Sequence, residues 1–596
     1  MTHWKPVEGH IMTRWAKDLS PDNVWPEYPR PQMTRAEWMN LNGLWQYTIA
    51  PRRQASVSEF PGQILVPFPV ESALSGVKQP LLSNQRLWYR RTFTIPPSWK
   101  GKKVLLHFGA VDWGTAVWVN GHQVGIHRGG YTPFFFDIPL HLNAGENELI
   151  VAVWDPTDTH WQERGKQALN PKSIWYTSVS GIWQTVWLEP VPQTYIRGLK
   201  LVPNIDAGTL EAVVHVDGED ADVIVNAVAF DGETEVASAT SEGNLPFQLS
   251  IPNPKLWSPD SPHLYDLKVT LFHKGQPLDE VGGYFGMRKF SMGRDEQGRT
   301  RLCLNNRPLF HFGPLDQGYW PDGLYTPPSD EAMRYDLEVC KQLGFNMLRK
   351  HIKVEPARYY YHCDRMGLIV WQDMPNGGQP VSGALSLVTM MFNVKRRDDH
   401  TYLRAGRQDP QSRANYKGEL KAMVDTLHNF PCIGMWVPFN EGWGQFDANE
   451  IAAWLKGYDR TRPVDHASGW FDQGGGDFES LHVYLKKNKS VPPTERRGVI
   501  LSEFGGYTLK IDKHVWDPTT EFGYKKFKTG QALTDAYVEL LEQQIKPWIH
   551  EGLSGAVYTQ TSDVEIEING YLTYDRAVLK MDAARILKIH KSLYQE

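Results

Sequence analysis

Two glutamates that follow short apolar runs are the residues best suited to chemistry in this sequence. Glu441 lies in CIGMWVPFNEGWG (Cys432–Gly444), and Glu503 lies in GVILSEFGG (Gly498–Gly506). An apolar run this short between turn residues is typical of a strand buried on both faces of a parallel sheet. Carboxylates at the carboxyl ends of such strands lie where α/β barrels carry their chemistry. If both strands belong to one barrel, we expect both carboxyls to face one mouth.

A pair of carboxyls over one mouth suits the cleavage of a glycosidic bond. Glu441, kept protonated, would donate a proton to the leaving oxygen, and Glu503, ionised, would attack the anomeric carbon and form a glycosyl-enzyme. A separation of roughly 5–5.5 Å between the carboxyls gives retention of configuration. The plainer interpretation is that either glutamate only pairs with an arginine at the mouth, and the repeated pattern of apolar run and glutamate argues against it.

The two roles require different surroundings. The acid form of Glu441 is favoured when neighbours in sequence such as Trp436 and Trp443 exclude water, and the charge of the second carboxylate acts in the same direction. The second glutamate is expected to be held ionised by donors such as Tyr484 or Arg349.

Polar side chains also end the other strand candidates, and we expect them to form hydrogen bonds in the mouth, to sugar hydroxyls or to each other. They are His351, Asp373, His466, His482, Tyr484 and Gln560. No close HxH or HxxxH pair exists, so we expect neither a catalytic metal nor a required cofactor, although a structural Ca²⁺ or Mg²⁺ is compatible with the sequence. A serine hydrolase is disfavoured because no G-x-S-x-G elbow occurs, and no P-loop pattern is present.

The composition indicates an ordinary globular protein of several domains. Its 596 residues are too many for one hydrophobic core, and 41% are hydrophobic and 22% charged. A net charge of −5 without a lysine or arginine block argues against nucleic-acid or membrane partners. The four cysteines are widely spaced, so we expect reduced, buried thiols. The 23 tryptophans fit either large aromatic cores or sugar-stacking surfaces.

The first residues, MTHWKPVEGHIMTRW, contain no apolar core of a signal peptide. We therefore expect a cytoplasmic protein, or a periplasmic or secreted one if a leader has been removed. The sequence leaves the oligomeric state open.

Residues 1–190 are expected to form a β-sandwich of the jelly-roll kind. Asn120-Gly121, between two strand candidates, is a strong signal for a two-residue hairpin turn. Five segments are rich in β-branched and aromatic residues: Tyr89–Ile95, Lys103–Phe108, Thr115–Val119, His122–His127 and Asn147–Trp154.

Residues 191–293 are expected to form a smaller, immunoglobulin-like sandwich, because short alternating strands recur at sandwich spacing. The segment NPKLWSPDSPHLY, with three prolines, suits an edge or a connection.

From residue 294 to 596, apolar strands alternate with amphipathic helices, which is typical of a (β/α)8 TIM barrel. The eight strand candidates are Leu309–Gly313, Asn346–His351, Leu368–Met374, Ile433–Asn440, Pro463–Ser468, Ser480–Leu485, Gly498–Glu503 and Ser554–Gln560.

The residues of two helices in this region can be predicted in detail. Ser329 is expected to cap one, which Gly344 ends, and Val538, Leu541, Ile545 and Trp548 form the apolar stripe of a later one. The long stretch 375–411 has no clear assignment and could form a lid or rim loop over the mouth.

At these motifs the sequence resembles glycoside hydrolase family 2, whose members include β-galactosidases, β-glucuronidases and β-mannosidases. The resemblance covers nearly the whole chain. NGLWQY, GAVDWGTAVWVNGHQVGIHRGGYTPF and SGIWQTVWLE resemble the sugar-binding jelly roll, and LWSPDSPHLY and FGMRKF resemble the end of the immunoglobulin-like domain. The third part resembles the catalytic barrel.

The resemblance implies roles for five residues. The Asn-Glu pair after the fourth strand makes Glu441 the general acid/base, with Asn440 bonded to the sugar's 2-hydroxyl. Glu503, after the seventh strand, becomes the nucleophile. Tyr484 is placed like the tyrosine that contacts the nucleophile, and His351 matches a histidine that contacts substrate.

The chain also departs from the family pattern. Many family β-galactosidases have a histidine- and arginine-rich motif after the first strand, where this chain has GPLDQGYWPDGLYT; Asp316, Gln317 and Trp320 could do comparable work. The β-glucuronidases recognise the sugar carboxylate through Asn-x-Lys, but the nearest candidate here, Asn569–Tyr571, has no lysine. This argues against a glucuronide and leaves a neutral sugar.

The sequence therefore predicts a retaining, exo-acting β-glycosidase for terminal neutral sugars, with β-galactosides first and arabinosides as a rival. Its partner is an oligosaccharide or other glycoside. The alternative from another class is a non-catalytic carbohydrate-binding protein with an inactive barrel. The expected substrate-binding residues are Asp316, Trp320, His351, Asn440, His482, Tyr484 and Gln560.

Overall fold

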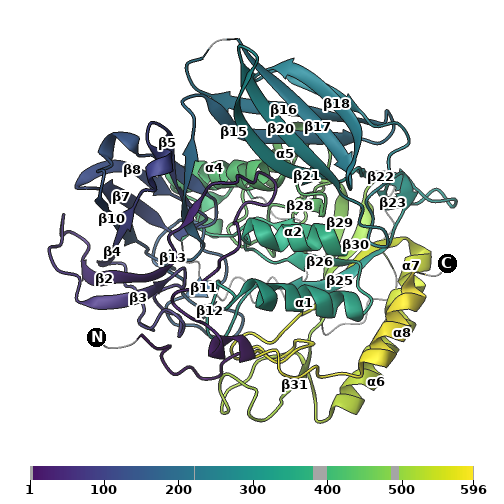
Figure 1. Cartoon of the computed structure of the whole chain (residues 1–596). Helices are drawn as coiled ribbons and strands as arrows, with labels where there is room; N and C mark the ends of the chain where they lie inside the picture. Colours follow the sequence, from purple (N-terminus) through teal and green to yellow (C-terminus); the bar gives the residue numbers. More distant parts are fainter. Residues whose placement is uncertain (1–3, 221, 380–398, 485–490, 492–495, 595–596) are drawn as a thin grey trace.

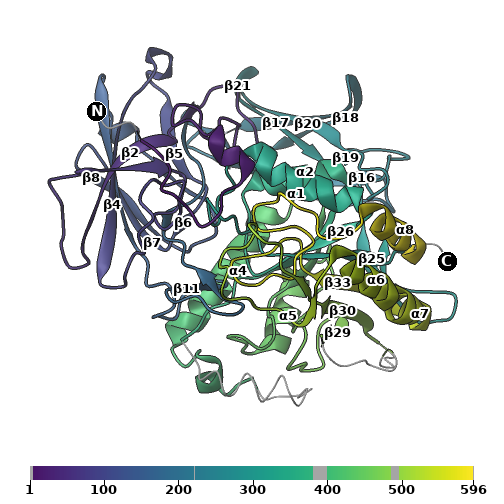
Figure 2. The ribbon, with the colours of Figure 1, turned by 90° about the horizontal axis from the view of Figure 1, so that it is seen from below.

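The computed structural model describes residues 4–220, 222–379, 399–484, 491 and 496–594. Three bodies follow one another along the chain (Figure 1). An N-terminal group of strands lies on one side, a second group of strands lies above, and a barrel with its helices fills the rest. Figure 2 shows the same three parts from below, with the N-terminal strands and helices α6 to α8 on opposite sides of the molecule. Predictions of these three architectures are confirmed.

The N-terminal body is a sandwich of two antiparallel sheets. Their facing sides bury Trp45, Leu106 and Val151 in one core. The six-stranded sheet has the order β3 (Gly62–Val66), β2 (Gly43–Pro51), β4 (Gln85–Thr94), β10 (Glu146–Trp154), β7 (Gly114–Val119) and β8 (His122–Arg128). The four-stranded sheet has the order β1 (Met39–Asn40), β14 (Val186–Val191), β5 (Lys103–Phe108) and β9 (Phe134–Asp137).

The five strands predicted in this region are present as β4, β5, β7, β8 and β10. Asn120 and Gly121 join β7 to β8 with φ of 50° and 80°, as a two-residue hairpin of this twist requires. Short pieces complete the body: η1 (Arg14–Lys17), η2 (Pro97–Trp99), η3 (Pro139–His141), β6 (Val111–Asp112), β11 (Gln167–Ala168), β12 (Tyr176–Thr177) and β13 (Gly181–Ile182).

The second body is a smaller sandwich with its own core, which includes Leu210, Val225 and Leu271. One sheet has the order β15 (Tyr195–Asn204), β16 (Thr209–Asp217) and β19 (Pro246–Ser250). The other has the order β18 (Thr234–Glu242), β17 (Val223–Asp231), β20 (Tyr265–His273) and β21 (Gln276–Phe285). The proline-rich segment NPKLWSPDSPHLY connects β19 to β20, as predicted.

Seven parallel strands form the barrel sheet. Their order is β28 (Ile433–Val437), β27 (Ile369–Asp373), β26 (Met347–Lys350), β25 (His311–Asp316), β33 (Leu553–Thr559), β30 (Gly498–Gly505) and β29 (Phe478–Val483). Six of them are buried along their whole length, which explains their mostly apolar sequences, whereas in β29 only Phe478 and Ser480 are buried. A small sheet of β22 (Phe290–Arg294), β23 (Thr300–Leu304) and β24 (Arg307–Pro308) precedes them.

The prediction of a strand at Pro463–Ser468 is wrong, because this segment does not form a regular strand. Val464 and Ser468 form only isolated parallel bridges, to Trp436 and Asn440, in the gap between β28 and β29. The Val464 N–H donates to the Asp477 side chain (2.8 Å) instead of a neighbouring strand, so no continuous ladder forms. The other seven predicted strands are present, although Leu485 lies outside the described residues.

Helices cover the outside of the barrel, and α1 and α2 lie side by side in both views. The Ser329 side chain accepts a hydrogen bond from Ala332 N (3.1 Å), which confirms the predicted cap of α1. The later predicted helix runs through α6, the π-helical turn η5 and α7. The bounds are α1 (Asp330–Gln342), α2 (Ala357–Met366), α4 (Pro410–Leu427), α5 (Ala448–Tyr458), α6 (Gly530–Leu540), η5 (Leu541–Ile545), α7 (Lys546–Glu551) and α8 (Ala583–Leu593).

Much of the predicted rim loop 375–411 lies outside the described residues. Its two described ends are joined where Gln379 N donates to Gly406 O (2.8 Å). The second end carries η4 (Tyr402–Ala405), and a separate pair, β31 (Tyr507–Leu509) and β32 (Lys525–Phe527), follows β30. In the described part of the chain, no helix combines the length and apolar character needed to cross a membrane.

Candidate active site

The two glutamates singled out in the sequence meet at the barrel mouth. Glu441 follows β28 in a left-handed turn with φ of 51°, where its N–H donates to Ser468 O (2.9 Å). Glu503 lies near the end of β30. One oxygen of each carboxyl and one ring nitrogen of His482 all lie within 4.8 Å of one another. This spacing suits the roughly 5–5.5 Å carboxyl separation of retaining glycosidases.

Glu503 is surrounded by groups that favour its ionised form. Arg349 Nη1 lies 3.1 Å from Oε1, and the Tyr484 hydroxyl donates to Oε2. His482 Nε2 lies 3.6 Å from Oε1. Burial would raise the pKa of Glu503, but the charges of His482 and Arg349 outweigh it and lower the pKa to about 2. The carboxylate is therefore ionised and available as a nucleophile at neutral pH.

Glu441 has the opposite electrostatic balance. Its Oε1 lies 2.8 Å from His482 Nδ1. Burial and then the negative charge of Glu503 raise the pKa of Glu441, although the hydrogen bond with His482 opposes them. Trp436 was expected to exclude water from this carboxyl. Its indole N–H donates a hydrogen bond to Asp459 Oδ2 (2.8 Å). The net result is a raised pKa, which favours the protonated form of Glu441 that a general acid needs.

A buried hydrogen-bond network fixes the floor of the mouth around Arg349. Arg349 Nε donates to Asp373 Oδ1 (3.0 Å), and Nη2 donates to Asn440 Oδ1 (2.8 Å). His351 Nδ1 lies 2.9 Å from Asp373 Oδ2. Among the described residues the Asn440 amide nitrogen has no hydrogen-bond partner, so it is free to donate to a ligand hydroxyl.

A second set of polar atoms lies at the end of β33. Gln560 Oε1 accepts from Gln317 Nε2 (2.7 Å), while Gln560 Nε2 has no partner in the described structure. Asn569 Oδ1 is likewise without a partner there, and its backbone oxygen accepts from Gln560 N (3.2 Å). Because buried amides normally bond, these two side chains are suited to a polar ligand.

Asp316 and Trp320, predicted to bind substrate, are held by other side chains. Asp316 is bonded to Lys350 Nζ (2.7 Å) and to the Tyr359 hydroxyl (2.6 Å). Trp320 is buried against Trp15 with a ring separation of 6.0 Å, and the Arg576 guanidinium lies 4.0 Å from its ring centroid. The segment after the first strand therefore packs into the protein, and these contacts leave little of either side chain for a sugar.

Partly exposed aromatic rings lie near the carboxyl pair, and sequence reasoning singled out only some of them. Tyr524 stacks on Tyr484 at 4.0 Å, and Trp470 meets His482 at 6.0 Å. Trp175, from the N-terminal body, packs against Trp443 at 5.1 Å. The one signal that pointed to these rings is the high tryptophan content, which fits sugar-stacking surfaces.

Glu441, His482 and Glu503 are also spaced closely enough to hold a metal ion, the one such group among the described residues. Two of these three side chains already share a hydrogen bond, and Glu503 also accepts one from Tyr484. The absence of a catalytic metal stays a prediction.

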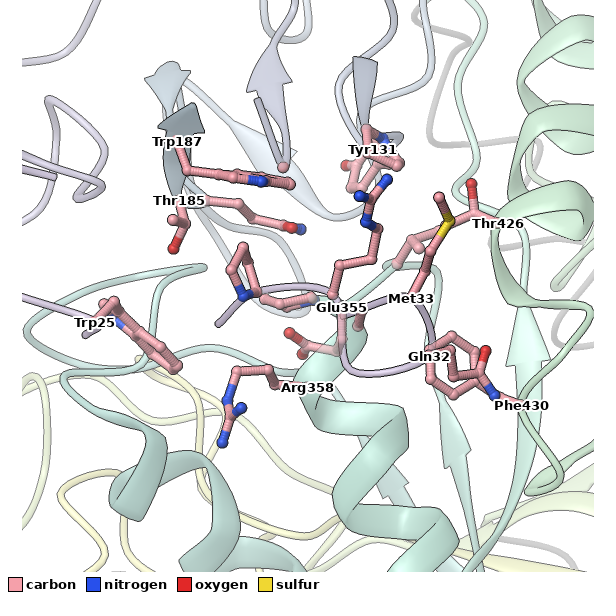
Figure 3. Close-up of a pocket in the computed structure, with 18 of the residues that line it drawn as sticks. Trp25, Gln32, Met33, Tyr131, Thr185, Trp187, Glu355, Arg358, Thr426 and Phe430 are labelled. Carbon is pink, nitrogen blue, oxygen red and sulfur yellow. The ribbon is translucent and has the colours of Figure 1, made fainter. Parts of the chain in front are cut away.

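A separate hollow of about 300 Å³ lies where the N-terminal body, β15 of the second body and the barrel meet (Figure 3). Figure 3 shows Trp25, Met33, Trp187 and Arg358 around it. Neither Glu441 nor Glu503 is among its lining residues, so this hollow is distinct from the site of the carboxyl pair.

Three family models match consecutive parts of the chain. The model described as "Glycosyl hydrolases family 2, sugar binding domain" matches residues 59–192. "Glycosyl hydrolases family 2" matches residues 194–288, and "Glycosyl hydrolases family 2, TIM barrel domain" matches residues 327–577.

Known proteins with similar sequences include two β-galactosidases. That of Thermoanaerobacter pseudethanolicus is 27% identical over 395 residues, which are 63% of this chain and 48% of the relative. That of Vibrio vulnificus is 25% identical over 614 residues, which are 91% of this chain and 55% of the relative. The chain thus spans about half the length of these relatives.

Two solved structures share the fold across nearly the whole chain. The β-D-glucuronidase of Dictyoglomus thermophilum has a TM-score of 0.73 at 18% identity, covering 96% of this chain and 99% of that one. The β-glucuronidase of Ruminococcus gnavus, in complex with D-glucuronic acid, has a TM-score of 0.71 at 17% identity, covering 96% and 100%. With the three family models matched in order on this architecture, the chain belongs to glycoside hydrolase family 2.

Proposed function

We propose that this chain is a retaining, exo-acting β-glycosidase in which Glu503 is the nucleophile and Glu441 the general acid/base. One observation carries the proposal: two carboxyls lie within 4.8 Å of each other while their surroundings shift the two pKa values in opposite directions. A catalytic pair of this kind needs one ionised and one protonated member at the same pH.

The geometry supports a double displacement. Glu441 would donate its proton to the glycosidic oxygen while Glu503 attacks the anomeric carbon, so that the leaving group departs and a glycosyl-enzyme forms. Glu441, now ionised, would take a proton from a water molecule that attacks the same carbon and releases Glu503. Arg349 and Tyr484 bond the Glu503 carboxylate and would keep it ionised and oriented between the two steps.

A neutral terminal sugar, with β-galactosides first and arabinosides as the rival, is the finer part of the proposal. The names of the two β-galactosidase relatives support it. Action at a chain end is supported by Trp175, which comes from the N-terminal body and packs on Trp443 beside the mouth. A mouth that these two tryptophans close on one side suits a terminal sugar better than a polymer that continues in both directions.

Replacement of the proposed nucleophile tests the mechanism. Glu503→Ala should abolish hydrolysis of aryl β-glycosides, and azide should restore turnover and give the α-glycosyl azide, because the small anion attacks from the vacated face. Glu450→Ala, which removes an exposed glutamate of α5, is the matched control and should keep wild-type rates. Unchanged activity of Glu503→Ala would refute the assignment, and an active wild-type protein would exclude a purely sugar-binding role.

A further inference from the structure

The turn that carries the proposed acid is held by contacts from outside the barrel sheet. Residues 440–445, here called the acid turn, follow β28, and Glu441 within them has a left-handed backbone with φ of 51°. Among the described residues, His482 is the one side chain that bonds the Glu441 carboxyl. Glu503, by contrast, lies in β30, which is paired on both sides, with β29 and β33. A displaced anchor of the turn should therefore move the acid and leave the nucleophile in place.

Arg407 is one of these anchors, and it meets the acid turn through one nitrogen of its guanidinium. Nε donates to Gly444 O (3.1 Å). The other two nitrogens bond the Glu163 carboxylate, with Nη1 2.8 Å from Oε1 and Nη2 2.6 Å from Oε2. Nη1 also donates to the Ser412 hydroxyl (2.9 Å). The Arg407 and Glu163 side chains are both fully buried, so water does not compete for these bonds.

Glu163 belongs to the N-terminal body, and main-chain contacts fix its segment against the barrel domain. Arg164 N donates to Asn376 O (2.8 Å), and Glu163 forms an isolated antiparallel bridge with Gly377. The acid turn packs on this same layer of backbone, because a Cβ at Gly444 would lie 2.4 Å from Gly377 O. The place of the acid turn is therefore set relative to the N-terminal body.

These backbone contacts already join the two domains, and a buried ion pair is a costly addition to them. Taking two charges out of water is unfavourable, and apolar side chains of similar volume are often equally stable or more so. What the pair adds is direction. A guanidinium that bonds a carboxylate through both terminal nitrogens has one orientation, and here that orientation aims Nε at Gly444 O.

We propose that Arg407 and Glu163 are positioning residues for the acid turn, so that the N-terminal body controls proton donation by Glu441. The inference rests on the proposed glycosidase function. Loss of the pair should displace Glu441 from the glycosidic oxygen while Glu503 attacks as before. A misplacement of about 1 Å can lower a rate by about 10²-fold. The loss should fall on substrates whose leaving group needs a proton and spare those whose leaving group departs without one.

The test measures kcat/KM for aryl β-glycosides of graded leaving-group pKa on wild type, Arg407→Lys and Arg462→Lys. Arg407→Lys keeps a positive charge beside Glu163, but one ammonium group cannot reproduce the planar fork that also reaches Gly444 O. Its kcat/KM should fall by roughly 10- to 100-fold for poor leaving groups and by less than about 3-fold for dinitrophenyl glycosides. Inactivation by a dinitrophenyl 2-deoxy-2-fluoroglycoside, which depends on Glu503 without the acid, should keep its wild-type rate.

Arg462→Lys is the matched control, because it makes the same change at the opposite end of β28. Arg462 is 4% exposed, and its guanidinium bonds the Asp459 carboxylate (3.2 Å) and Ile433 O (3.1 Å). Ile433 is the first residue of β28, so this variant should lower the melting temperature without disturbing the acid turn. Its kcat/KM should change by the same factor for every leaving group.

A double variant separates positioning from stability. Glu163→Leu combined with Arg407→Met leaves no isolated charge, so the protein should remain folded. It should still lose activity on poor leaving groups selectively, because the donor to Gly444 O is gone. This variant carries the test if Arg407→Lys does not fold.

Several outcomes would overturn the role of the pair. They are a loss of equal size across the substrate series in Arg407→Lys or the double variant, a slower inactivation by the fluoroglycoside, and a selective loss in Arg462→Lys. If wild type turns over no aryl glycoside, the proposed function fails and this inference with it. If Glu441→Ala shows the selective loss and the Arg407 variants match wild type, the proposed function stands and only the positioning role fails.

Discussion

At the scale of single residues, one histidine lies between the two proposed catalytic carboxyls. His482 Nδ1 is 2.8 Å from Glu441 and Nε2 is 3.6 Å from Glu503. The two carboxyls have different hydrogen-bond donors around them. Among the described residues, Arg349 and Tyr484 donate to Glu503 but not to Glu441. This asymmetry, more than the spacing, separates the proposed acid from the proposed nucleophile.

Glu441→Ala should show the loss of a general acid in two linked ways. Because the pKa of Glu441 is raised, its protonated form persists above the ordinary range and is lost as pH rises, which gives wild-type kcat/KM a decline on the alkaline side. In Glu441→Ala that decline should disappear. Its kcat/KM should fall by roughly 10²–10⁴-fold for poor leaving groups and much less for activated aryl glycosides, which need little proton donation.

The measurement is kcat/KM against pH for a series of aryl glycosides of graded leaving-group pKa. Equal losses across the series, with the alkaline decline retained, would contradict the assignment of Glu441. Glu450→Ala serves again as the control.

At the scale of elements, the ends of the barrel strands decide which side chains meet. Glu503 lies near the end of β30, Asp373 ends β27, and Arg349 lies in β26. Parallel strands bring their carboxyl ends to one edge, so side chains distant in sequence converge without any special loop. Glu441 stands further out, in the left-handed turn after β28.

The cap of α1 is a local device whose contribution can be measured separately. Ser329→Ala should destabilise the first turn of α1 by about 1 kcal/mol, because Ala332 N–H loses its acceptor. Ser329→Asp should preserve the cap. Amide hydrogen exchange at Ala332 reports the effect, and equal protection in wild type and Ser329→Ala would contradict it.

At the scale of the whole molecule, the N-terminal body is part of the site rather than an appendage. Glu163 and Arg407 form an ion pair of 2.6 Å between that body and the barrel, and both side chains are fully buried. Arg407 also donates to Gly444 O (3.1 Å), close after Glu441. The pair therefore joins the N-terminal body to the loop that carries the proposed acid.

Breaking one member of this pair should cost more than removing both. Arg407→Met leaves the Glu163 carboxylate buried and unpaired, for which we expect a loss of about 3–5 kcal/mol in stability. Glu163→Leu combined with Arg407→Met should recover much of that loss, since no isolated charge remains. Thermal unfolding of the full chain, run on both single variants and the double variant, checks this; additive losses would contradict it.

The sequence by itself determined the features that depend on local pattern. Buried parallel strands favour apolar runs, so seven of the eight barrel strands could be located from sequence, with Glu503 near the end of one and Glu441 just after another. The Asn120-Gly121 turn and the Ser329 cap were predictable for the same reason, because a few neighbouring residues specify each of them.

Only the tertiary structure decided the contacts between distant segments. Pro463–Ser468 has the composition of a strand, but the backbone N–H of Val464 donates its hydrogen bond to the Asp477 side chain. Asp316 is bonded by Lys350 and Tyr359, and Trp320 is buried under Trp15. Trp175 packs on Trp443 from another domain. Such outcomes depend on which surfaces meet when three domains pack, and no local periodicity encodes that.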